Sequence, residues 1–359
     1  MPRWVICHPG PAHSVGDVYN GWAEALRELG QQVFEYNLGD RLTFYDSAYL
    51  ELDDGSYRKA LQDDDGVAEL ALNGLASMLW KARPRILLII SAFFWDADLL
   101  EHARAAYGTT VVMLHTECPY EDDRQLMAAP YADLHLLNDP VSVPKFAKIC
   151  RAVYCPHGYR PGVHFPASPG AGYRYDLAFA GTGFPSRVAF LEGMDLDGLE
   201  VHLAGNWMGT PEGSPLWEHL PGGGQALLGN AGVADMYRQT RVGINLYRRE
   251  ANHPDLAEGH GCGPREIEMA ACGAFFLRDP RPESDGLFPM LPSFTSADEA
   301  SELLRWYLPR EDLRRELAGK AREAVADRTF TNHARRLMGL LGITELGRCK
   351  CHVYMAATA

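Results

Sequence analysis

The sequence lacks any apolar run long enough to cross a membrane. Its longest runs, such as Ile86–Ile90, have the length of a strand, whereas a membrane-spanning helix needs roughly 20 apolar residues. The first ten residues already contain glycine and proline, and no apolar segment there is long enough for a secretory signal. We therefore expect no membrane span and a cytoplasmic location.

Positive charge is also scarce. The chain of 359 residues carries 34 Lys and Arg against 47 Asp and Glu, a formal net charge of −13, and residues 1–160 alone hold 14 basic and 22 acidic residues. Proteins that bind duplex nucleic acid through its phosphates carry the opposite charge. The acidic balance disfavours duplex nucleic acid as a partner, although it leaves room for a local basic patch.

Several catalytic and structural motifs are absent. Neither the G-x-S-x-G elbow of serine hydrolases nor a P-loop occurs in the chain, which argues against both enzyme classes. The eight cysteines include no CxxC pair and predict reduced thiols rather than a disulfide framework. The set His253, Asp255, His260 and Cys262 fits no familiar zinc spacing. We therefore predict no metal site and no cofactor.

What is present is a regular alternation of apolar strands and amphipathic helices. Apolar strand patterns followed by polar or turn residues favour a parallel sheet covered by helices. The alternation stops at 158–175, where glycine, proline and aromatic residues cluster, and a second series then begins. The predicted fold class is α/β, with two Rossmann-like doubly wound units facing a central cleft. Functional residues should therefore come just after strands.

A glycine-rich turn joins a strand to a helix shortly before Arg187. Its backbone at Gly181, Thr182 and Gly183 is suited to close approach by a phosphate, with Arg187 as a charge partner. The turn also resembles a dinucleotide fingerprint, which needs an acidic residue at the end of the next strand. That strand ends in Ala-Gly-Asn at 204–206, which disfavours a nicotinamide enzyme. An ordinary turn with a surface arginine is the alternative.

A short helix is predicted to begin after Gly263, because Pro264 suits the first helical position. Its first turn crowds Arg265, Glu266 and Glu268 beside a helix end that favours anions. Arg265 and Glu268 share one face, so the arginine could reach a diphosphate while the carboxylate accepts ribose hydroxyls. A solvated ion pair is the plain alternative for these two residues.

Two further segments follow strands in the second half. One is 205–209, which contains Asn206, and the other is 243–250, in which Asn245 lies near the end of a strand. Together the four segments follow the order and spacing of the nucleotide-sugar half of GT-B glycosyltransferases. With "PHGYRPGVHFP" before the linker, "REIEMAACGAFFLRD" in the second half and "TFTNHARRLMGLL" at the end, the chain resembles the CgeB-like (spore maturation type) glycosyltransferases. These are related to the large retaining family with a "FEAMACG" signature.

The resemblance implies roles for single residues. Glu268 takes the place of the glutamate that binds the donor's ribose, and Arg187 the place of a lysine that grips the diphosphate. The family's arginine five positions earlier is Thr182 here, and its glutamate eight positions before Glu268 is His260. We expect Arg265 to supply the charge that Thr182 lacks.

The resemblance also implies a mechanism without bound metal and with retention of configuration. The leaving diphosphate would be stabilised by Arg187, Arg265 and backbone amides. On the acceptor side, His115 and Glu117 follow a strand and are candidates to position the acceptor's hydroxyl. A structural histidine and a solvated acid are the alternatives, and a retaining mechanism needs no obligatory side-chain base.

The expected function is transfer of a sugar from a nucleotide-diphosphate sugar, with UDP-sugar favoured, to a hydroxyl acceptor. The resemblance implies an acceptor-binding domain at 1–160, a donor-binding domain at 161–330, and a helix crossing back with a flexible tail at 331–359. The acceptor stays open among a protein, a polysaccharide, a small molecule and a modified DNA base. An epimerase, a phosphorylase and an inactive nucleotide-sugar-binding module are the alternatives.

Overall fold

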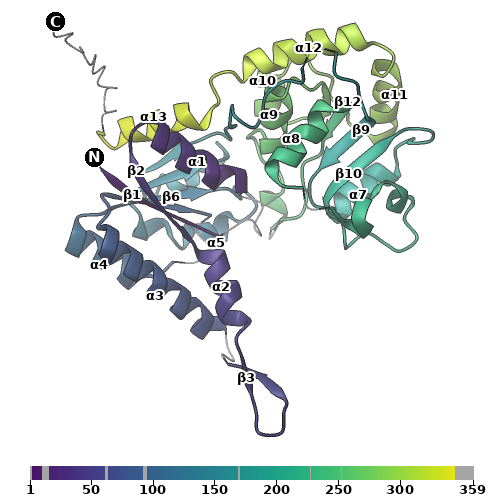
Figure 1. Cartoon of the computed structure of the whole chain (residues 1–359). Coiled ribbons are helices and arrows are strands. Elements are labelled where there is room, and N and C mark those ends of the chain that lie inside the picture. The colour runs from purple at the N-terminus through teal and green to yellow at the C-terminus, as the bar shows by residue number, and fades with distance from the viewer. Residues whose placement is uncertain are drawn as a thin grey trace, which may run out of the picture.

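A computed structural model describes residues 2–9, 16–60, 64–91, 95–168, 170–226, 228–251 and 253–343. The predicted tail beyond residue 343 lies outside the described residues. The chain forms two α/β units, which Figure 1 shows side by side. In the part of the chain that the structure describes, no helix is both long and apolar enough to cross a membrane.

The first unit is built on a six-stranded parallel sheet with the order β2-β1-β5-β6-β7-β8. The strands are β1 (Arg3–His8), β2 (Gln32–Asn37), β5 (Ile86–Ile90), β6 (Thr110–His115), β7 (Leu134–Leu137) and β8 (Ala152–Tyr154). The helices are α1 (Gly16–Glu28), α2 (Leu38–Asp46), α3 (Asp64–Ala82), α4 (Ala97–Tyr107), α5 (Asp122–Leu126), α6 (Val143–Phe146) and the 3-10 turn η2 (Ala129–Tyr131).

Both faces of this sheet are buried, which explains the unbroken apolar strands. On β1, Trp4 and Ile6 face one apolar cluster, whereas Val5 and Cys7 face another. Successive side chains of a strand point to opposite faces, so each face needs its own cover. Trp22 of α1 lies in the first cluster and Leu75 of α3 in the second. The helices on the two sides are thus fixed by burial.

A two-stranded antiparallel hairpin extends away from the first unit (Figure 1). It consists of β3 (Tyr49–Glu51) and β4 (Tyr57–Lys59), whose residues are all exposed.

The second unit has a five-stranded sheet with the order β11-β10-β9-β12-β13, parallel except where β10 meets β11. Its strands are β9 (Tyr175–Ala180), β10 (Val201–Asn206), β11 (Gln225–Ala226), β12 (Thr240–Asn245) and β13 (Phe276–Arg278). Its helices are α7 (Pro185–Glu192), α8 (Asn230–Arg238), α9 (Pro264–Ala271), α10 (Pro282–Leu287), α11 (Ala297–Tyr307) and α12 (Glu311–Ala324). The 3-10 turns are η3 (Pro215–His219), η4 (Pro221–Gly224) and η5 (Pro254–Leu256).

The last helix returns to the first unit. Helix α13 (Phe330–Leu340), yellow in Figure 1, packs on α1, and its Phe330 and Leu337 belong to the first unit's core. The chain therefore crosses between the units twice, and the two crossings touch. The Tyr159 amide donates to the Arg328 carbonyl at 2.9 Å, and the Phe330 amide donates to the Tyr159 carbonyl at 3.2 Å.

Candidate active site

The carboxyl ends of β9 and β12 form part of one wall of a cavity of about 370 Å³ between the units. Parallel strands present their carboxyl ends at one edge, which is where ligands bind in doubly wound folds. The first unit contributes residues that include Asp17, Thr116, Glu117, Tyr120, Asn138 and Asp139. The second unit contributes residues that include Gly181, Thr182, Arg187, Asn245, Arg248, Arg265, Glu268 and Arg281.

The turn between β9 and α7 brings backbone close to this cavity. Gly181 and Thr182 line it, whereas Gly183 packs against the ring of Trp207. Gly205, at the end of β10, lies so close to Gly181 that a Cβ there would sit 2.1 Å from the Gly181 carbonyl oxygen. The glycines are thus required by close packing of backbone on backbone and on indole.

Arg187, in the first turn of α7, is a partly buried cation without a carboxylate partner among the described residues. It donates to the backbone carbonyls of Thr182 and Leu246, each at 3.0 Å, and lies over the ring of Phe184. Among the described residues, no carboxylate oxygen lies within 4 Å of its guanidinium. Burial lowers the pKa of Arg187 to about 10, so the group is still charged at neutral pH. A partly buried positive charge of this kind at a cavity wall is suited to an anionic ligand.

Helix α9 begins as its sequence predicts, with Gly263 as the cap and Pro264 at the first position. Arg265 Nη1 donates to Glu268 Oε2 at 2.6 Å, and both residues line the cavity. Glu268 is only 3% exposed. The pair is therefore part of the cavity wall rather than a solvated surface pair.

Five of the predicted site residues do not line the cavity. Two of them lie at its edge: Asn206 is exposed at the end of β10, and His260 is exposed in the loop before α9. The His260 amide donates to Asp139 Oδ2 of the first unit at 2.8 Å, so this loop contacts the facing wall through its backbone. Gly183, His115 and Glu266 are enclosed by neighbouring side chains.

His115 ends β6 as predicted, but its side chain points into the core of the first unit. It is fully buried, its Nε2 lies 2.8 Å from His135 Nδ1, and its ring packs on Phe146. Burial and the neighbouring His135 lower the pKa of His115 to about 3, so its ring is neutral. The structure gives His115 a hydrogen-bonded place in the core, away from the cavity where an acceptor would bind.

Glu117, two residues farther on, does line the cavity. Burial raises the pKa of its carboxyl above the usual range. Arg248 faces it across the cavity with Nη1 3.6 Å from Glu117 Oε2, and the guanidinium lies over the ring of Tyr120. Glu117 and Arg248 thus connect the two walls.

A family model described as glycosyl transferase-like matches residues 187–340. No curated protein sequence matches the chain. Among solved structures, sucrose-phosphate synthase from Thermosynechococcus elongatus superposes with a TM-score of 0.64 at 12% identity, covering 95% of this chain and 98% of that one. HepE from Anabaena, in complex with UDP, gives a TM-score of 0.59 at 10% identity and coverages of 95% and 100%.

The chain has the GT-B fold of these glycosyltransferases, and its second half matches the glycosyl transferase-like family. A glycosyltransferase from Rickettsia africae shows the same likeness, with a TM-score of 0.62 at 11% identity and coverages of 95% and 97%. The predicted fold class, two doubly wound α/β units, is confirmed. The domain ranges and the single-residue roles stay predictions.

Sequence reasoning missed several residues that line the cavity. Arg248 and Arg281 come from loops whose strands were recognised, but nothing in the sequence says which of the neighbouring arginines turns inward. Asp17 opens α1 just after a strand, and that position was the available signal. Tyr120 and Asp139 reach the cavity only through the approach of the two units.

Glu266, also in the first turn of α9, supports the cavity wall that the second unit forms. It is fully buried and accepts hydrogen bonds from Tyr247 Oη, Ser284 Oγ and the Gly263 amide. Burial raises its pKa from 4.5 to about 7. This glutamate supports the wall from behind instead of meeting a ligand.

Because of Glu266, the free energy of unfolding of the protein should fall as pH rises. Its folded pKa lies above the unfolded value, so the folded state binds more protons between about pH 4.5 and 7, and this contribution to stability is lost across that window. We expect the stability of Glu266→Gln relative to wild type to increase by up to about 3 kcal/mol between pH 5 and 8. Urea unfolding at several pH values measures it.

The exposed Glu192→Gln, on α7 of the same unit, is the control and should follow the wild type at every pH. A constant difference between Glu266→Gln and wild type across this range would contradict the expected titration.

Proposed function

We propose that the protein transfers a sugar from a UDP-sugar to a hydroxyl acceptor, with retention of configuration and without a metal ion. The observation that carries this proposal is Arg187, a partly buried cation with no carboxylate partner among the described residues, at a glycine turn that lines an interdomain cavity. HepE, of similar fold, has been crystallised with UDP and with UDP-glucose, which supports a uridine donor.

The leaving diphosphate needs positive charge, and the cavity wall supplies it as side chains. Four arginines line the cavity, all from the second unit: Arg187, Arg248, Arg265 and Arg281. Arg265 pairs with Glu268, and Arg281 Nη2 donates to Tyr120 Oη at 2.6 Å. Arg187 is bound only by backbone carbonyls, so we assign it the diphosphate. Preorganised cations in a closed site stabilise charge that develops in the transition state.

Glu268 is proposed to bind the ribose, and Glu117 to position the acceptor's hydroxyl from the facing wall. Burial raises the pKa of Glu117, which makes its carboxylate a better proton acceptor than an exposed glutamate. Retention, the CgeB-like subtype and a cytoplasmic location belong to the same proposal and rest on the sequence resemblance. The acceptor stays a protein, a polysaccharide, a small molecule or a modified DNA base.

Nucleotide binding is the first test. In the presence of EDTA, we expect UDP and UDP-glucose to raise the melting temperature of the full chain, with weaker effects of GDP, ADP and dTDP. A ligand at one hundred times its Kd stabilises the folded state by about 2.7 kcal/mol, which thermal unfolding detects readily. No shift with any nucleotide would overturn the proposal.

The chemistry is tested separately by product analysis with UDP-glucose. An epimerase would convert the sugar without an acceptor, a phosphorylase would require inorganic phosphate, and an inactive module would bind without turnover. The replacements at Thr182 and His260 make the last outcome the relevant alternative. Release of UDP that depends on an added acceptor supports the transferase.

A further inference from the structure

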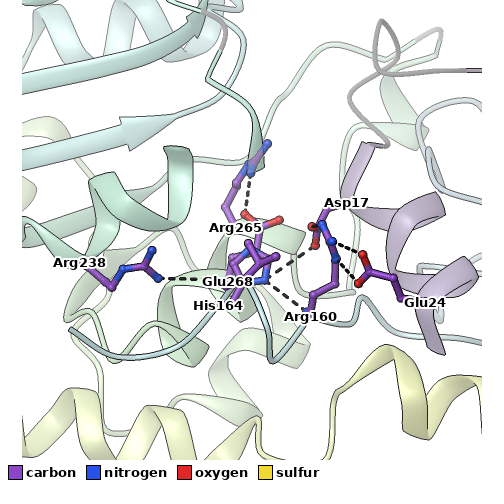
Figure 2. A network of polar contacts seen from close by, with 8 residues as sticks. Asp17, Glu24, Arg160, His164, Arg238, Arg265 and Glu268 are labelled. Atoms are coloured by element: carbon purple, nitrogen blue, oxygen red, sulfur yellow. Dashed lines mark hydrogen bonds and ion pairs between the residues drawn. The ribbon is translucent and has the colours of Figure 1, made fainter. Parts of the chain in front are cut away.

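Three buried polar side chains from three parts of the chain meet beside the cavity. They are Asp17 of α1, His164 of the segment that joins the units, and Glu268 of α9 (Figure 2). One ligand atom from each lies within 4.8 Å of the other two. Asp17 and Glu268 also line the cavity, from opposite walls. Two carboxylates from separate units therefore face the same space.

Each carboxylate is held by an arginine through one oxygen. Arg160 Nη1 donates to Asp17 Oδ1 at 3.1 Å, and Arg265 Nη1 donates to Glu268 Oε2 at 2.6 Å. Arg160 also binds Glu24, whose side chain is half exposed and does not line the cavity. The arginines fix the orientation of the two carboxylates and leave one oxygen of each without an arginine contact.

The second oxygen of Asp17 has no hydrogen bond among the described residues although it is buried. Asp17 is 5% exposed, and its Oδ2 lies 3.9 Å from His164 Nδ1, beyond hydrogen-bond distance. A buried acceptor without a partner costs free energy, so its persistence indicates that a ligand supplies the missing donor. Burial and the nearby Glu268 raise the pKa of Asp17 to about 6, which leaves it ionised at neutral pH. The site therefore offers acceptors and needs donors.

Two kinds of ligand could supply what this gap needs, a cation or a pair of hydroxyl groups. The charges favour hydroxyls, because Asp17, Glu24 and Glu268 already face Arg160 and Arg265, leaving one net negative charge that a divalent ion would overcompensate. His164 also argues against a metal. Its Nδ1, the ring nitrogen that faces Asp17, accepts a hydrogen bond from the Arg160 amide at 3.3 Å, so the lone pair of that nitrogen is already engaged.

We propose that Asp17 is a second ribose-binding residue, which accepts one hydroxyl of the donor's ribose while Glu268 accepts the other. This inference rests on the proposed function. The first unit would thereby contact the donor directly, through a residue at the start of α1, and the ribose would be held from both walls. Binding of the nucleotide then satisfies the buried Oδ2 of Asp17.

The test compares UDP with 2′-deoxy-UDP and 3′-deoxy-UDP, by calorimetry on the full chain. A hydrogen bond to a charged group accounts for roughly tenfold in affinity or more, so wild type should prefer UDP over both deoxy forms by at least that factor. In Asp17→Ala the preference over one deoxy form should fall below about threefold, whereas the other persists. A merely structural role would weaken all three ligands alike.

Glu24→Ala is the matched control, because it also removes a carboxylate bound to Arg160 but lies outside the cavity, and it should keep both preferences. Asp17→Asn serves as a second variant if Asp17→Ala fails to fold. Full discrimination against both deoxy forms in the Asp17 variants, or none in wild type, overturns the inference while leaving UDP binding intact. Wild type that does not bind UDP overturns the proposed function as well. Stabilisation by MnCl2 or ZnCl2 that requires Asp17 and His164 would show a metal site instead.

Discussion

Arg187→Met should lower kcat/KM for the UDP-sugar by about 100-fold or more and weaken UDP binding by at least about tenfold. Arg187 lines the cavity, has no carboxylate partner among the described residues, and contacts the glycine turn through the Thr182 carbonyl. Without the Arg187 guanidinium, the diphosphate loses the cation that we assign to it. Methionine keeps most of the packing against Phe179 and Phe184, so the change isolates the charge.

Two further variants make this expectation specific. Arg187→Lys keeps the charge but loses the planar fork, so it should retain more activity than Arg187→Met. Arg241→Met removes an exposed arginine at the other end of β12, paired with Asp176, and should behave like wild type. UDP affinity of Arg187→Met equal to that of wild type would rule out Arg187 as the diphosphate ligand.

Gly205→Ala should destabilise the protein by about 3 kcal/mol or more and abolish nucleotide binding. An added Cβ would lie 2.1 Å from the Gly181 carbonyl oxygen, a backbone atom that cannot move without shifting the glycine turn. Gly205 also has a φ of +129°, which side chains with a Cβ rarely adopt. Both effects act on the wall that holds Arg187. Urea unfolding and UDP calorimetry measure the two consequences.

Gly209→Ala, four residues farther on, is the control. Gly209 is exposed and has no atom within 4 Å of the position a Cβ would take, so its stability should stay within about 0.5 kcal/mol of wild type. A Gly205→Ala protein as stable as Gly209→Ala would show that the turn can relax, and the tight contact would then not explain the glycine.

The cavity wall that the second unit forms could largely be predicted from the sequence, because local chemistry determines it. Gly263 and Pro264 define the start of α9, and the apolar run that follows defines β13. A helix start fixes the relative position of Arg265 and Glu268 by its own geometry, so the shared face followed without tertiary information. The same holds for the glycine turn before Arg187.

The sequence did not show whether a buried polar side chain faces the cavity or the core. Glu266 and Glu268 are two residues apart in one helix, yet Glu266 supports the wall from behind and Glu268 lines the cavity. His115 ends a strand, where a catalytic residue is expected in this fold, but it pairs with His135 inside the core. Which polar group is enclosed depends on side chains from distant segments, such as Ser284 and Phe146.

Contacts between the units were the least predictable part of the site. Asp17, Tyr120 and Asp139 reach second-unit residues only because the two sheets face one another at a particular angle. No local pattern encodes that angle. It follows from the packing of α13 on α1 and from the segments that cross between the units.

The two segments that cross between the units together define one axis that connects them. Because the Tyr159 and Arg328–Phe330 segments are hydrogen-bonded side by side, the units share one narrow line of covalent attachment rather than two separated ones. Sliding or twisting of one unit over the other would have to break these hydrogen bonds. We therefore expect relative movement of the units to be a rotation about that line, which would keep Asp17 opposite Glu268.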